Sequence, residues 1–86
     1  MYDPECASGR VTPEFSELEA NILAAHRAED KALLAKLYWD ASRMFSATGD
    51  DDAEGFFLTH AWIFALDAGL PEAKQYRTRL VELGRL

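Results

Sequence analysis

From about residue 13 onwards the sequence repeats the apolar spacing of amphipathic helices. No segment shows the alternation of apolar and polar residues that is typical of a strand. Apolar residues repeat every three or four positions in four segments, which predicts amphipathic helices over about residues 13–28, 31–48, 51–68 and 71–84. Links of two to four residues favour antiparallel neighbours. The sequence therefore predicts an all-α fold, a four-helix antiparallel helix-turn-helix mini-bundle.

Residues at the segment ends fit the rules for starting and stopping a helix. Thr12 can cap the first helix, with Pro13 as its first residue, and Asp30 can cap the second. Gly49 can adopt the left-handed conformation that ends the second helix. The acids of residues 50–52 then favour the positive N-terminal end of the third helix. Since no distal glutamate of a calcium loop follows them, we interpret this run as helix capping.

The chain has 86 residues, enough for one small domain. Residues 1–12 combine Pro4, Gly9 and small polar residues without periodicity, so we expect a flexible N-terminal tail. Residues 13–86 then form a single helical domain.

The apolar stripes predict which helix faces are buried. In the segment 51–68 the apolar residues surround nearly the whole helix, so this helix should be the central element, with neighbours on both flanks. The predicted main stripes are Phe15, Leu18, Ile22 and Ala25; then Leu34, Leu37, Tyr38, Ala41, Met44, Phe45 and Thr48; then Ala53, Phe57, His60, Ala61, Phe64 and Ala68; and finally Ala73, Tyr76, Leu80 and Leu83. In the third segment, the stripe is widened by Phe56 and Ile63 on one flank and by Leu58 and Ala65 on the other.

The composition of the chain argues against nucleic acid and membrane as binding partners. The net charge of −6 disfavours nonspecific binding to nucleic acid, because such binding neutralises phosphates. His60 and Asp67 break the longest apolar runs well short of the ~20 residues that span a membrane. The first ten residues lack a secretory signal, and the lone Cys6 cannot form an internal disulfide. These features favour a cytoplasmic protein that binds neither nucleic acid nor membrane.

The side chains that could carry chemistry show no catalytic or ligand spacing. His60 lies on an apolar helix face, where a histidine usually bonds a backbone carbonyl or a carboxylate. Cys6, His26 and His60 are the candidate zinc ligands, but they fall on a tail and two different helices. The hydroxyls of Ser42, Ser46 and Thr59 are better explained by helix packing. We therefore predict no enzyme activity, no metal and no cofactor.

Two tryptophans are the candidate partner-binding residues. Trp39 projects opposite to the main stripe of its helix, one turn from Lys36 and Arg43, and Trp62 lies off the main face of the third helix. Buried aromatic residues carry much of the binding energy of interfaces. The alternative is that the first helix covers Trp39 and the last helix covers Trp62.

The second and third predicted helices resemble a tetratricopeptide repeat over about 35 of the 86 residues. Four departures from the family pattern accompany the likeness: Ala41 replaces the usual leucine, one residue is missing between Phe45 and Ala53, His60 occupies a small-residue position, and the proline comes late. The matching residues are Tyr38, Ala41, Ser42 and Phe45 in the first helix, Gly49 and Asp50 in the turn, and Ala53 and Phe57 in the second helix.

The resemblance implies a helical scaffold that binds a protein or a peptide. Since a repeat array usually needs about three repeats, a chain with at most two should close into a mini-bundle or associate with itself. We therefore expect a small protein–protein interaction module. The alternatives are a homodimer without another ligand and a helical protein that binds a metal or small molecule through His60.

Overall fold

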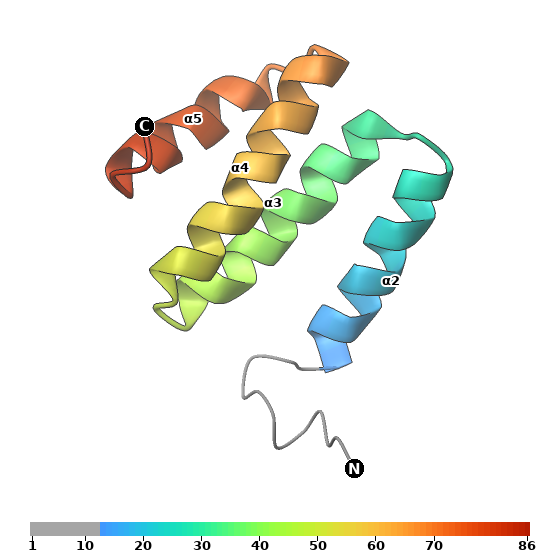
Figure 1. Cartoon of the computed structure of the whole chain (residues 1–86), viewed down its shortest axis with the longest axis horizontal. Helices are drawn as coiled ribbons and strands as arrows, with labels where there is room; N and C mark the ends of the chain where they lie inside the picture. Colours follow the sequence, from blue (N-terminus) through green and yellow to red (C-terminus); the bar gives the residue numbers. More distant parts are fainter. Residues whose placement is uncertain (1–12) are drawn as a thin grey trace.

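The computed structural model describes residues 13–86 and shows four helices without a strand in that range (Figure 1). They are α2 (Pro13–Arg27), α3 (Lys31–Ala47), α4 (Asp51–Ala68) and α5 (Glu72–Glu82). The all-α mini-bundle is confirmed, and each helix lies within two residues of its predicted bounds. The predicted tail and the Thr12 cap lie outside the described residues.

The three links between helices share one backbone arrangement. Each places a residue in the left-handed conformation after the helix, at intervals of twenty residues: Glu29 (φ 54°), Gly49 (φ 76°) and Gly69 (φ 69°). Two backbone hydrogen bonds then close each preceding helix, in the pattern of a Schellman motif. Asp30 and Asp50 follow the first two of these residues and cap the next helix, each accepting a backbone N–H at 3.1 Å. The predicted cap at Asp30 is therefore confirmed, and Asp50 is the acid of the run 50–52 that caps α4.

Two apolar clusters hold the helices together, and α3 contributes to both. One lies between α2 and α3, and the other lies among α3, α4 and α5. Small residues allow α3 and α4 to approach closely, because Ala35, Ala61 and Ala65 are completely buried in the same cluster. Rings also fill this seam, where Phe45 of α3 stacks on Phe57 of α4 with centroids 5.4 Å apart.

The central helix is only partly as predicted. α4 does pack against both α3 and α5, but its third side faces solvent, with Phe56 and Ile63 exposed. The fully buried positions of α4 include Leu58 and Ala65, which we had placed on a flank of the stripe. Thr48 at the end of α3 is also exposed. In each case the apolar pattern predicted the helix correctly. Which side of the helix is buried depends on where the neighbouring helices lie.

A buried carboxylate joins three helices. Glu54 of α4 is completely buried, and Arg79 of α5 donates hydrogen bonds to both of its oxygens. Arg43 of α3 reaches the same carboxylate at 3.4 Å. Because these arginines stabilise the ionised form, the pKa of Glu54 lies below its ordinary value. This ion pair thus fixes α5 against the α3–α4 pair.

Candidate functional site

A groove opens between α2 and α4, with α3 as its floor. Its volume is about 310 Å³, within the size range of ligand sites. We call it the aromatic groove. It is lined by Phe15, Glu19, Ile22, Leu23, His26, Tyr38 and Phe57.

Aromatic rings form a continuous network along this groove. Tyr38 is its centre and stacks on Phe57, His60 and Phe64, with centroid distances between 5.1 and 6.2 Å. Phe56 extends the network outwards, since its ring lies 4.7 Å from that of His60. The side chain of Phe56 is 58% exposed, so the network reaches the solvent. A partner could therefore add apolar contacts to a surface that is already ordered.

The groove also contains a polar pair. The ring nitrogen Nε2 of His26 and the hydroxyl of Tyr38 are 3.0 Å apart, which links α2 to α3 by a hydrogen bond. Burial raises the pKa of Tyr38 above that of a free tyrosine, so its hydroxyl stays protonated at neutral pH. The Tyr38 hydroxyl keeps capacity for a further hydrogen bond with a ligand, because a phenol can both donate and accept, whereas His26 Nε2 has its one position occupied by this bond.

His60 lies beside this groove as a packed histidine. Its Nδ1 is 2.9 Å from the backbone carbonyl oxygen of Phe56, one turn earlier in α4. The predicted bond to a backbone carbonyl is confirmed. Among the described residues, no group of three or more His, Cys, Asp or Glu side chains could hold a metal ion. Cys6, the remaining zinc candidate, lies outside the described residues.

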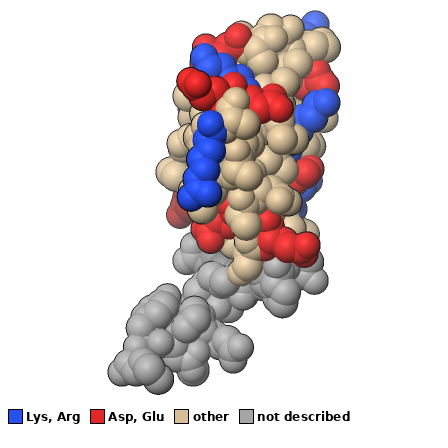
Figure 2. All heavy atoms as spheres, turned by 90° about the vertical axis from the view of Figure 1, so that its right-hand side faces the viewer, with Lys and Arg blue, Asp and Glu red and all other residues tan. Residues whose placement is uncertain are grey.

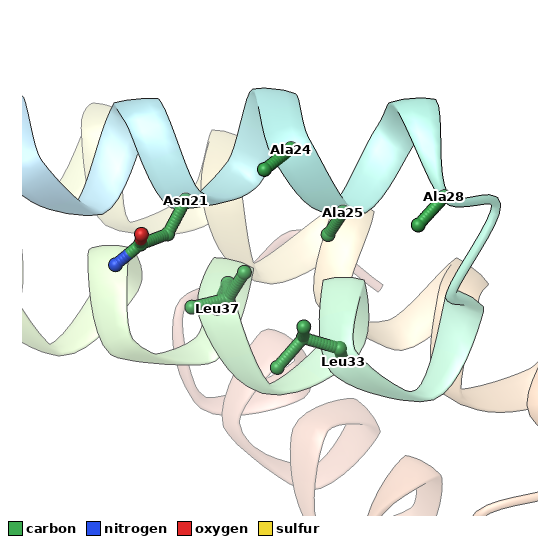
Figure 3. A pocket seen from close by; sticks show the side chains of 6 residues that line it. All are labelled: Asn21, Ala24, Ala25, Ala28, Leu33 and Leu37. Atoms are coloured by element: carbon green, nitrogen blue, oxygen red, sulfur yellow. The ribbon is translucent and has the colours of Figure 1, made fainter.

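A second groove, lined mainly by alanine and leucine, lies on the other side of α2 (Figure 3). Its volume is about 370 Å³, and its walls come from α2 and α3. The amide of Asn21 is its one polar side chain. We call it the alanine groove, and it is lined by Asn21, Ala24, Ala25, Ala28, Leu33 and Leu37.

The structure corrects the surroundings predicted for Trp39. Its ring is half-buried and stacks on Tyr76 of α5, with centroids 4.8 Å apart, in a cluster separate from the one that holds Leu37 and Ala41. The helix that covers Trp39 is α5 and not α2. This is possible because α3 packs against α2 on one side and contacts the cluster of α4 and α5 on the opposite side. The guanidinium of Arg43 lies 5.2 Å from the ring, as their spacing suggested, while Lys36 is exposed.

Trp62 is half-buried against the same cluster, to which α5 contributes Ala73, Tyr76 and Leu80. That the last helix covers this residue stays a prediction. A partner-binding role for Trp39, Lys36, Arg43 and Trp62 stays a prediction, although the two tryptophans already have packing partners within the chain.

Sequence reasoning missed the aromatic groove. We assigned Phe15, Tyr38 and Phe57 to the buried stripes of their helices. We made no prediction of which side of α2 carries Leu23 and His26. A signal was present, because Phe15, Glu19 and His26 follow one another at helical spacing beside the main stripe of α2. What the sequence could not show is that α4 lies opposite this flank.

Comparisons with known proteins add no identification. None of the family models, curated proteins and solved structures with which the chain was compared matches it. The resemblance to a tetratricopeptide repeat therefore stays a prediction. No helix in the described range is both long and apolar enough to cross a membrane.

Proposed function

We propose that this protein is a small protein–protein interaction module whose binding surface is the aromatic groove. The observation that carries the proposal is the partly exposed ring network that lines this groove and continues beyond it to Phe56. Leu23, on its α2 rim, is 55% exposed and enlarges the apolar surface. Contiguous apolar surface of this kind marks interaction sites on folded domains.

The aromatic groove supports this role better than the alanine groove does. Tyrosine and other aromatic residues are enriched where interfaces bind tightly, whereas alanine is depleted there. The aromatic groove also offers a directional group, the Tyr38 hydroxyl, which can fix the orientation of a bound segment. The alanine groove offers the amide of Asn21.

Site-specific photocrosslinking tests the proposal. A benzophenone amino acid would replace Leu23 at the groove or Leu66 away from it, two positions with the same exposure of 55%. The crosslinking is done with proteins of the native host, and crosslinked partners are identified by mass spectrometry. We expect one discrete crosslinked partner with the probe at Leu23 and none with the probe at Leu66. Equal crosslinking from both positions would place the binding surface elsewhere.

Self-association is the second candidate function. It is favoured by the exposure of Phe56, Ile63 and Leu23, since exposed large apolar residues are often covered by a second copy. Light scattering at increasing protein concentration would show a dimer. In that case Phe56→Ser should restore the monomer, while Leu66→Ser should leave the dimer intact.

A further inference from the structure

Charge is distributed unevenly between the two helices that flank the aromatic groove, α2 and α4, and the other two helices. The flanking helices are acidic: α2 has three acids and one base, and α4 has four acids and no base, with histidines counted as neutral. By contrast, α3 has three bases and one acid, and α5 has three bases and two acids. The two helices that flank the groove therefore carry a summed net charge of −6 over their whole length, while the other two carry +3.

Most acidic side chains of α4 form ion pairs with lysine or arginine of the same chain. Glu54 pairs with Arg79 and Arg43, and the other two pairs join Asp52 to Arg85 and Asp67 to Lys31. The groove itself has one acid, Glu19, and no lysine or arginine lines it. In the part of the chain that the structure describes, Glu19 forms no ion pair. Its carboxylate is thus free to meet a charge brought by a ligand.

The surface beside α2 carries charges of both signs around an uncharged strip (Figure 2). Figure 2 looks onto the outer side of α2, where uncharged surface runs along the helix. Acidic residues gather at both the upper and the lower end of this view, and lysine and arginine lie among those of the upper and middle part.

We propose that the partner segment is basic: an amphipathic peptide that inserts a large apolar side chain into the aromatic groove and places an Arg or Lys against Glu19. This inference rests on the proposed function and names its partner class. The apolar side chain would contact Tyr38 and Phe57, and the cation would gain from both the carboxylate and the neighbouring ring faces. An acidic segment would instead meet repulsion from Glu19.

A designed pair of probes tests this assignment. The first is a fluorescein-labelled helical peptide of about 18 residues, a length typical of a natural helix, composed of Leu, Lys and Ala. The second replaces every Lys by Glu, and a third replaces every Leu by Ser. Fluorescence anisotropy measures binding of each probe to the full chain. We expect the Leu–Lys probe to bind and the other two to bind at least about tenfold more weakly, a difference of about 1.4 kcal/mol.

Matched variants locate the bound probe. Glu19→Lys should weaken binding of the Leu–Lys probe about tenfold, whereas Glu17→Lys, the same charge change on another face of α2, should alter it less than about twofold. Leu23→Ser should also weaken binding, and Leu66→Ser, with equal exposure, should not. Circular dichroism confirms that each variant is folded.

The outcomes separate the two proposals. If the Leu–Glu probe binds equally well and still depends on Leu23, the groove is a binding site and the basic partner is wrong. If the Leu–Lys probe binds but responds equally to Glu19→Lys and Glu17→Lys, the attraction comes from overall charge and this inference is overturned. If no probe binding depends on Leu23, both the partner class and the groove are rejected.

Discussion

Arg79 on α5 donates two hydrogen bonds to the buried carboxylate of Glu54 on α4, from Nε at 2.8 Å and from Nη2 at 3.1 Å. The two residues are 25 positions apart in the chain. Bidentate pairs of this kind are directional as well as strong. The pair therefore sets how α5 lies on α4, and the first two predictions concern it.

Arg79→Met should destabilise the fold. The substitution leaves Glu54 buried with only the longer contact from Arg43, and losing one member of a buried pair costs about 3–5 kcal/mol. Urea unfolding followed by circular dichroism measures this loss. Arg77→Met is the matched control, because Arg77 is exposed on the same helix, and it should change stability by less than about 0.5 kcal/mol. Similar losses in the two variants would contradict the role of the pair.

Stability should also fall with acidification. Since the Arg79 hydrogen bonds lower the pKa of Glu54 in the folded state, the unfolded chain takes up the proton first. The contribution of Glu54 is then complete above its unfolded pKa of 4.5 and is lost as the pH falls through the folded pKa. Urea unfolding between about pH 6 and pH 3 should show a steeper loss for the natural chain than for Glu54→Gln. Parallel curves would show that other carboxylates cause the acid dependence.

Trp39→Ser should cost stability. We expected a surface tryptophan from the helical pattern, but the ring stacks on Tyr76 and joins the core of α5. Since the ring is half-buried, the loss should be about 2 kcal/mol, below the range for a fully buried tryptophan. Chemical unfolding measures it, with Lys36→Ser one turn away as the control. An unchanged midpoint would mean that α5 does not cover Trp39 in solution.

Glu29→Gly should stabilise the chain. Glu29 adopts φ 54°, the conformation that Gly49 and Gly69 take at the equivalent places in the other links. A side chain in this conformation costs roughly 1 kcal/mol, and glycine removes that cost. Thermal and urea unfolding should both show the gain. The reciprocal variant Gly49→Ala should lose a similar amount, so stabilisation by both substitutions would refute the strain argument.

The accuracy of the sequence predictions depended on the range of the interactions involved. The caps at Asp30 and Asp50 were predicted correctly because a cap forms with a backbone group three residues away. The buried side of α4 was partly wrong, since Phe56 has the same apolar character as the buried Leu58 and only the neighbouring helices distinguish them. For the same reason the aromatic groove was missed, although most of its lining residues had been recognised as apolar.

The sequence by itself determined four helices, their ends and the all-α class, because hydrophobic periodicity, capping and left-handed turns act within a few residues. Only the tertiary structure decided that Trp39 meets Tyr76, that Glu54 meets Arg79, and that α2 and α4 face each other across Tyr38. These contacts join residues that are distant in the chain. Their partners are selected by how helices pack against one another, and that selection leaves no local pattern in the sequence.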